Sequence, residues 1–445
     1  MADISNNLTA ALGQATRLAD MRRRLLFLLG GLIVFRVGSY IPVPGIDSVA
    51  AANFFSSNSG TILGLANMFT GGALARLSIF AMGVMPYISA SIIVQMMSMV
   101  IPQLQALRKE GESGRRKITQ YTRYLTVPLA MFQAYGAALA IQSGKFVYAP
   151  GFQFLFVATV TMTAGTVFLM WLGEQITERG MGNGISMIIL TGIVANIPLA
   201  IGNTLDRVSS GEMGAPFFIL LIAVIVMVTG FCVFMERAQR RIAVNYAKRQ
   251  VGRRVFAGQV SHLPFKLNMS GVIPPIFASS ILVFPATIAQ FFAQSPDPTW
   301  WQKGLQDVSQ ALNSGQPLHI ILYAALIIFF CFFYTALMIN SRETAENLQK
   351  SGAFIPGIRP GQQTASYIDK VLTRLTMWGG FYVMAVCILP EILRASSNVP
   401  FAFGGTSLLI VVVVIMDFIA QMSAHLMSHQ YESLLKKANL SGRKS

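Results

Sequence analysis

Long runs of apolar residues, separated by short polar segments, dominate the chain from residue 25 to residue 424. A helix that crosses the hydrocarbon core of a bilayer needs about 20 mostly apolar residues. Ten runs approach that length, and we expect them to be membrane-spanning helices. The expected spans are residues 25–41, 75–101, 124–141, 152–172, 185–201, 216–235, 271–292, 318–339, 371–389 and 401–424. The pattern therefore predicts an all-α polytopic membrane protein.

The ten spans divide into two halves of five that share short motifs. The second span reads PYISASII from Pro86 and the seventh reads PPIFASSI from Pro274, with Pro, Ile, Ala, Ser and Ile in register. The fifth span opens GISMII at Gly184 and the tenth opens GTSLLI at Gly405. Because five is odd, the halves must cross the membrane in opposite directions, as an inverted repeat. Such folds place their functional path between the halves, so we expect the second, fifth, seventh and tenth spans to line it.

These boundaries divide the chain into four parts. Residues 1–24 are an N-terminal tail, and residues 25–201 are the N-terminal half. Residues 202–424 are the C-terminal half, and residues 425–445 are a C-terminal tail. Two long connections, at about residues 236–270 and 340–370, belong to the C-terminal half.

Composition agrees with a membrane protein and sets its orientation. The chain is 53% hydrophobic and 12% charged, whereas roughly a quarter of the residues of a soluble domain are charged. A soluble globular protein is therefore excluded. Of the 34 Lys and Arg residues, 27 lie in one set of alternate connections and tails and 4 in the other set. Basic residues are retained on the cytoplasmic side, so we expect both termini in the cytoplasm.

The expected path offers aliphatic side chains and few ionisable ones. Transporters of ions and polar solutes usually place ionisable groups at mid-membrane, but Glu174 and Glu178 lie at a span end. Asp417, in the last span, is interpreted either as a carboxylate near the interface or beside a subunit, which is the simpler view, or as a transport group. A narrow aliphatic ring excludes ions and makes no specific bond to what passes, which suits a large and variable substrate. The aliphatic candidates are Val84, Ile88, Ile185, Ile189, Ile276 and Ile410.

A short apolar stretch at residues 61–69 precedes the second span. It is too short to cross a bilayer, and Gly60, Gly71 and Gly72 flank it with flexible joints. It is either a re-entrant helix that fills the path or an ordinary surface helix of the loop. The residues alone favour the surface helix.

The chain carries no recognisable catalytic or nucleotide-binding motif. No GxxxxGK[ST] loop, HExxH motif or Ser/His/Asp arrangement is present. Cys232, Cys331 and Cys387 each lie in an apolar run without paired spacing, which indicates small apolar fillers. We therefore expect no enzyme activity, no cofactor and no metal, and the energy for any transport must come from outside the chain.

The two long connections are basic. The connection at 236–270 holds eight Lys and Arg residues, and Ile242, Val244 and Tyr246 alternate with their neighbours as in a half-buried strand, so we expect a protruding hairpin. The connection at 340–370 carries Arg359 between Pro356 and Pro360. The need to orient the chain in the membrane explains part of this positive charge. The length of the two connections and their stiffened tips instead favour docking sites, for which acidic partners or RNA phosphates are the natural ligands.

Six segments of the chain are distinctive enough to compare with known families. They are MPYISASI, GESGRRKITQYTRY, FLMWLGEQITERGMGNGISMI, RRIAVNYAKRQ, ETAENLQKSGAFIPGIRPG and FGGTSLLIVVVVIMDF. They resemble the bacterial SecY family, the channel subunit of the general protein translocase, and the likeness runs from about Arg22 to Asn439. The resemblance implies a channel in the cytoplasmic (inner) membrane that translocates unfolded secretory polypeptides and releases apolar segments sideways into lipid. It implies ten spans in two inverted halves, with the stretch at about 61–70 as a re-entrant plug helix.

The resemblance also assigns residues and partners. The aliphatic candidates become the pore ring, with Val84 where isoleucine is common in the family, and the remaining site residues fall into three groups. The plug residues are Ile62, Leu65, Asn67 and Phe69, the lateral-gate residues are Ser89, Ile92, Phe277 and Ser280, and the docking residues are Arg253, Arg254, Arg342 and Arg359. The gate would open between spans two and three on one side and seven and eight on the other. The implied partners are SecE and SecG as channel subunits, the motor ATPase SecA, the ribosome through its RNA, signal peptides, nascent chains and membrane lipids.

Two other classes of function remain as alternatives. An inverted-repeat secondary transporter of a small solute predicts a compact polar site at mid-membrane and leaves the basic loops unexplained. An intramembrane enzyme lacks any catalytic constellation in the sequence.

Overall fold

The computed structural model describes residues 21–47, 50–51, 62–143, 147–211, 214–246, 249–251, 254–256, 260–292, 304, 311, 316–397 and 405–441. This part of the chain is mostly helical. The first helix spans residues 21–38. The later helices are α3 (Ile62–Phe69), α4 (Met85–Val100), α5 (Pro102–Lys109), α6 (Glu112–Ser143), α7 (Phe152–Arg179), α8 (Gly184–Ser209), α9 (Ala215–Arg237), α10 (Ile273–Phe292), α12 (Pro317–Met338), α13 (Ser341–Lys350), α14 (Gln362–Ser397) and α15 (Gly405–Ser441).

Each of the ten expected spans overlaps one of these helices. By length and composition alone, six of the described helices are candidate spans, or seven if the bent pair α4 and α5 forms one span. The all-α membrane architecture is thus confirmed, and the count of ten spans stays a prediction. Outward-facing apolar residues on α9, such as Ile219, Met227 and Phe234, are more than two-thirds exposed, as lipid-facing side chains are in an integral membrane protein.

The start expected for the second span is wrong. The second span was expected from residue 75, but residues 70–84 form turns and α4 begins at Met85. Gly71, Gly72 and Gly83 there adopt positive φ angles, which interrupt a helix. Several helices extend beyond the expected spans, as α6 does from Glu112 and α15 does to Ser441, because hydropathy detects only the apolar part of a helix.

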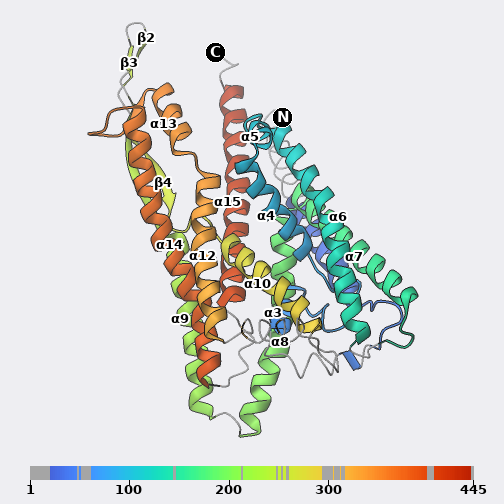
Figure 1. Cartoon of the computed structure of the whole chain (residues 1–445). Coiled ribbons are helices and arrows are strands. Elements are labelled where there is room, and N and C mark those ends of the chain that lie inside the picture. The colour runs from blue at the N-terminus through green and yellow to red at the C-terminus, as the bar shows by residue number, and fades with distance from the viewer. Residues whose placement is uncertain are drawn as a thin grey trace, which may run out of the picture.

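The hairpin expected in the first basic connection is present. Strands β1 (Gln239–Tyr246) and β4 (Val260–Lys266) pair antiparallel, from Gln239 opposite Lys266 to Asn245 opposite Val260. The short hairpin of β2 (Arg249–Val251) and β3 (Arg254–Phe256) lies beyond them (Figure 1). Ile242 and Val244 are buried as expected, but the expectation for Tyr246 is wrong, since this end of the strand is exposed.

The two basic connections form one structure. Strand β5 (Ala353–Phe354), from the second connection, pairs with β1 and gives the order β4-β1-β5. Ile242 and Val244 pack with Ile355 and with Ile368 of α14 in a small separate core. Together with α5, α13 and the C-terminal end of α15, these loops lie at one end of the molecule, and the turn between α8 and α9 lies at the opposite end (Figure 1).

The two halves repeat the same backbone arrangements. Gly83 and Gly271 each stand two residues before a helix, with φ angles of +57° and +61°, and each is followed by a valine and then by a proline in the first turn of the helix. Gly184 and Gly405 each begin a helix, and a Cβ atom at either would lie 2.0 Å from a carbonyl oxygen of the preceding helix. The motifs that indicated the inverted repeat therefore have matching structural roles.

Candidate functional site

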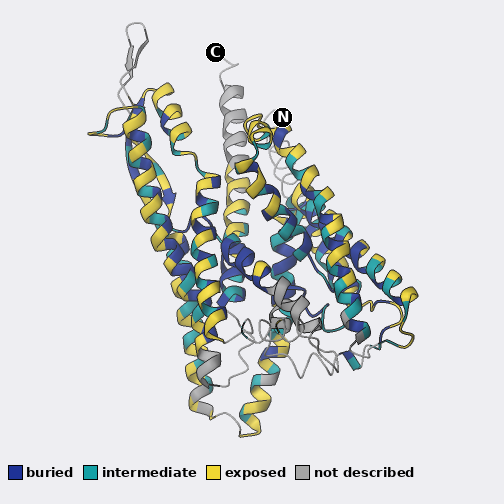
Figure 2. Cartoon of the chain, in the orientation of Figure 1, coloured by how far each residue is buried: buried dark blue, intermediate teal, exposed yellow. Residues whose placement is uncertain are grey.

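The side chains expected to form the constriction converge from four helices. Val84 precedes α4, Ile88 lies on α4, Ile189 on α8, Ile276 on α10 and Ile410 on α15. All five are buried, at most 7% exposed, and belong to one cluster of apolar side chains. Ile185 of α8 is partly buried against the same cluster. Figure 2 shows buried residues gathered around α10, with exposed residues along the outer faces of α6 and α14.

The inverted repeat explains which residues enter this constriction. Ile88 and Ile276 occupy equivalent positions, as do Ile189 and Ile410. The position equivalent to Ile185 holds Thr406, whose hydroxyl lies 2.8 Å from the Tyr323 hydroxyl. This hydrogen bond joins α12 to α15 at the position that Ile185 occupies in the N-terminal half.

Sequence reasoning missed the counterpart of Val84 in the second half. Val272 stands in the second half where Val84 stands in the first, and it is 7% exposed in the same buried cluster. The signal was present in the sequence, because GVMP at Gly83 matches GVIP at Gly271.

The short helix α3 lies against the constriction. It contacts α8 and α10, and Phe69 at its end is 9% exposed within the same buried cluster. The Asn67 side chain accepts a hydrogen bond from the Ala75 backbone N–H at 2.8 Å, which closes the turn after the helix. The side chains of Ile62 and Leu65 lie outside the described part. This placement favours the re-entrant interpretation over a surface helix.

The expected gate residues lie where the two halves meet. Helix α10 contacts α4 and α6 of the N-terminal half and α12 of its own half. Ile92, Phe277 and Ser280 are buried, and Ser89 is partly buried. The Ser280 Oγ atom lies 3.5 Å from the Met85 sulfur across this boundary and also donates to the Ile276 carbonyl at 2.7 Å. The contact is therefore mainly apolar, with weak polar contributions.

A second polar link joins the halves near the basic loops. The Arg108 guanidinium, in the last turn of α5, donates a hydrogen bond to the carbonyl oxygen of Leu337, near the end of α12. This bond connects the segment between α4 and α6 to the helix that flanks α10.

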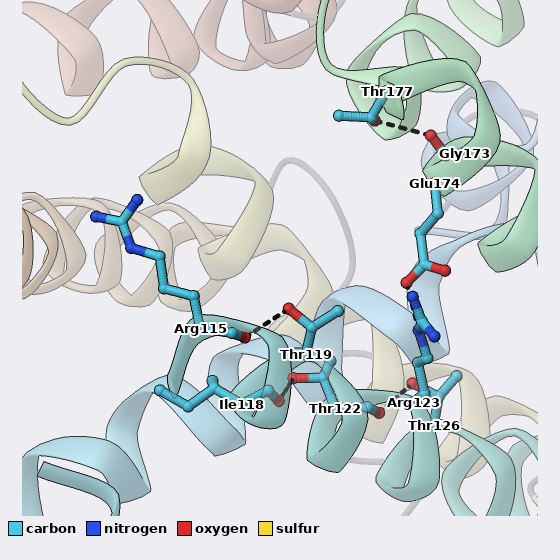
Figure 3. Close-up of polar contacts among 9 residues, drawn as sticks. All are labelled: Arg115, Ile118, Thr119, Thr122, Arg123, Thr126, Gly173, Glu174 and Thr177. Carbon is cyan, nitrogen blue, oxygen red and sulfur yellow. Dashed lines mark hydrogen bonds and ion pairs between the residues drawn. The ribbon is translucent and has the colours of Figure 1, made fainter. Parts of the chain in front are cut away.

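A polar network braces the N-terminal half (Figure 3). The Arg123 Nε atom of α6 lies 2.8 Å from the Glu174 Oε1 atom of α7. The neighbouring threonine hydroxyls donate to carbonyls of their own helices, as Thr122 does to Ile118 and Thr177 does to Gly173. In this network the ion pair is the contact that joins α6 to α7.

Two of the four expected docking arginines have described side chains. Arg342 and Arg359 are exposed, on α13 and on the turn before α14. The Arg359 carbonyl accepts a hydrogen bond from the buried Thr364 hydroxyl at 2.9 Å, which fixes the turn. Arg253 lies outside the described residues, and Arg254 opens β3 with its side chain outside the described part.

The structure also places Asp417 and the three cysteines. Asp417 lies 3.6 Å from the Lys266 Nζ atom, and both side chains are more than half exposed, in agreement with the simpler interpretation of Asp417 as a carboxylate near the interface. Cys232, Cys331 and Cys387 are buried in helices, as fillers would be.

Sequence reasoning missed a buried pair, His319 and Glu391, because the two residues are far apart in the chain.

These features define an integral membrane protein of two similar helical halves, with a buried apolar cluster where they meet and basic loops at one end. A family model described as SecY matches residues 78–419. The chain belongs to the SecY family.

Relatives and solved structures agree with this membership. The chain is 59% identical to the protein translocase subunit SecY of Vibrio cholerae, over 96% of each chain. It is 60% identical to that of Pseudomonas aeruginosa, over 96% of this chain and 95% of the relative. A structure concerned with the plug domain of the SecY protein has a TM-score of 0.68 at 18% identity, over 92% of this chain and 93% of that one. Sec61 in a canine ribosome-channel complex has a TM-score of 0.64 at 16% identity over the same shares.

Proposed function

We propose that the chain is the central subunit of a protein-conducting channel, which passes unfolded secretory polypeptides across the cytoplasmic membrane and releases apolar segments into it. One observation carries the proposal: aliphatic side chains from four helices of both halves converge in a single buried cluster, against which α3 packs. Membership of a family whose members are named protein translocase subunits supports it.

An aliphatic ring fits this substrate for a physical reason. An extended polypeptide rises about 3.3 Å per residue and presents every kind of side chain in turn. Ile88, Ile189 and Ile276 offer no hydrogen bond that would hold one side chain longer than the next. Closed, the same side chains pack together and exclude water, which stops ions.

Helix α3 acts as the plug in this proposal. Phe69 joins the constriction cluster, so α3 must leave before a polypeptide can pass. The plug role of the related SecY structure supports the assignment of Asn67 and Phe69 and, by continuity of the helix, of Ile62 and Leu65.

The lateral exit lies between α4 and α6 on one side and α10 and α12 on the other. Ser89, Ile92, Phe277 and Ser280 lie along this boundary. A segment that leaves there partitions by its own hydrophobicity, since a central Arg or Asp costs roughly 2.5 to 3.5 kcal/mol on the insertion scale. Because the contact is mainly apolar, lipid can replace it when it opens.

The basic loops are the docking surface for a motor or a ribosome. Arg253, Arg254, Arg342 and Arg359 belong to loops that lie at one end of the molecule (Figure 1). Acidic protein surfaces and RNA phosphates are the natural ligands of exposed arginines, and the ribosome-bound Sec61 structure supports such a use. We assign this end and both termini to the cytoplasm, SecA and the ribosome as its partners, and SecE and SecG as further subunits of the channel.

A crosslink tests the channel directly. In a variant whose three native cysteines are replaced, Ile189→Cys should form a disulfide with a cysteine in a secretory polypeptide stalled during translocation. Ile222→Cys, on the exposed face of α9, is the matched control and should not react. Equal reaction at both positions, or at neither, would contradict a path through the constriction.

A further inference from the structure

Arg36 is a charged residue within an apolar helix, and the proposed role of the channel leaves it unexplained. It lies near the end of the first helix (residues 21–38) and is partly buried. Ionisable groups in membrane spans are costly and are retained where they have a partner. The Arg36 Nη1 atom donates a hydrogen bond to the Gly71 carbonyl oxygen at 2.7 Å. Gly71 lies in the turn after α3, two residues beyond Phe69, the last residue of the helix.

The Arg36 side chain is held in place by its neighbours. Its Nη2 atom donates to the Tyr40 hydroxyl at 3.2 Å, and its guanidinium carbon lies 5.1 Å from the centre of the Tyr40 ring. The Arg76 guanidinium carbon lies 4.0 Å from the same ring. The aromatic ring therefore lies against both cations, an arrangement that stabilises each of them.

The end of α3 makes an unusually close backbone contact with α8. A Cβ atom at Gly71 would lie 2.9 Å from the Gly192 Cα atom, and one at Gly192 would lie 3.1 Å from the Phe69 carbonyl oxygen. Gly71 also has a φ angle of +69°, which a residue with a side chain adopts only with strain. Carbonyl groups at a helix C-terminus attract a cation, so the Arg36 guanidinium is well placed at this end.

The turn that follows α3 is fixed to the segment after the first helix by backbone bonds. The Val43 N–H donates to the Leu77 carbonyl at 3.0 Å, and the Ile79 N–H donates to the Ile41 carbonyl at 2.9 Å. The segment after the first helix and the turn after α3 thus form one unit. Helix α3 itself also contacts α10 of the other half.

We propose that Arg36 is the latch that retains α3 in the closed channel, by holding the Gly71 carbonyl on the N-terminal half. This inference rests on the proposed function, in which α3 is the plug. When the halves part, α3 loses its contact with α10 but keeps the bond to Arg36. Arg36 is then a positioning residue that sets how readily the plug leaves.

The test measures how often α3 leaves its closed position. The reporter is Thr70→Cys, in the assembled complex without native cysteines, because Thr70 is 4% exposed beside Gly71. Its rate of reaction with a membrane-impermeant maleimide is measured in sealed vesicles, together with chloride leak. Arg36→Met should raise both by roughly tenfold or more, the factor expected for losing a hydrogen bond to a charged donor.

Three further variants separate a latch from a general defect. Arg36→Lys keeps a cationic donor and should restore most of the protection from labelling. A role that depended only on the shape of the arginine side chain would not predict this recovery. Gly192→Ala should raise labelling in the same direction, since its Cβ would press on Phe69 and Gly71. Arg374→Met, at an exposed site on α14, removes a cation elsewhere and should change nothing.

The outcomes distinguish the latch from the channel itself. If the parent complex translocates a secretory polypeptide but Arg36→Met labels and leaks like the parent, the latch is refuted and the channel stands. If the parent complex translocates nothing, the proposed function fails whatever the labelling shows. Equal labelling of Arg36→Met and Arg36→Lys, both raised, would also refute the latch.

Discussion

At the scale of single residues, His319 and Glu391 form a buried contact that has no part in the proposed function. The two side chains are 3% and 8% exposed, and Nε2 of the histidine lies 3.4 Å from Oε1 of the carboxylate. The His319 ring also stacks on Tyr323, with ring centres 5.9 Å apart. Within the described residues, His319 Nδ1 and Glu391 Oε2 have no hydrogen-bond partner. Each residue therefore depends on the other, and together they join α12 to α14.

Replacing both members of this pair should destabilise the protein by less than the sum of the two single replacements. His319→Phe or Glu391→Leu alone leaves a buried polar group without its partner, which costs about 1 to 3 kcal/mol. The double variant buries two apolar groups in contact, so its loss should be smaller than the sum of the single losses. Thermal unfolding of the purified complex measures this, with His262→Phe on the exposed strand β4 as the control. Additive losses would show that the two residues do not interact.

At the scale of elements, α10 contacts both its own half and the N-terminal half. It packs on α12 through Phe277 and Phe330, whose ring centres are 5.7 Å apart, and it faces α4 through the Ser280 and Met85 contact. The first contact lies within one half and the second joins the two halves. Arg123 and Glu174 brace α6 to α7, so α4, α6 and α7 are expected to move as a unit (Figure 3). Opening should then occur between α4 and α10.

A disulfide across this boundary should close the channel reversibly. With native cysteines replaced, the pair Met85→Cys and Ser280→Cys should block translocation and membrane insertion when oxidised and restore both when reduced. The control pair is Phe231→Cys with Tyr382→Cys, which joins α9 to α14 within one half, where the native rings lie 5.8 Å apart, and should leave transport working in either state. Transport through the oxidised Met85 and Ser280 pair would place the gate elsewhere.

The helices, and the burial of the aliphatic candidates in one cluster, could largely be predicted from sequence, whereas the contacts that hold them could not. Apolar runs located the helices, and the repeated motifs pointed to Ile88, Ile189, Ile276 and Ile410, because both signals are periodic and local. The turn at residues 70–84 was missed because its residues are as apolar as a span, and only the backbone angles of its glycines reveal it. The Arg36 and Gly71 contact joins residues 35 positions apart, and no local pattern indicates it.

At the scale of the whole molecule, the two basic connections lie together at one end (Figure 1). The proposed function assigns this end to the docking partners. The strands β1, β4 and β5 bring both basic connections together, with Ile355 buried in their shared core. The turn at Arg359 is therefore a rigid projection, anchored by Ile355 on one side and by Thr364 on the other. In the proposed function, the basic residues gathered at this end provide the surface on which a motor or a ribosome docks.

Reversing the charge at this projection should uncouple the motor without unfolding the channel. Arg359 is exposed, and its backbone is held by Thr364, so Arg359→Glu should leave thermal stability within about 0.5 kcal/mol of the parent. The new carboxylate would repel an acidic partner surface, and SecA-driven translocation into vesicles should be abolished. Arg207→Glu, near the end of α8 at the opposite end of the molecule, is the matched control and should translocate normally. Normal export by Arg359→Glu would remove this residue from the docking surface, while loss in both variants would indicate a general effect of charge.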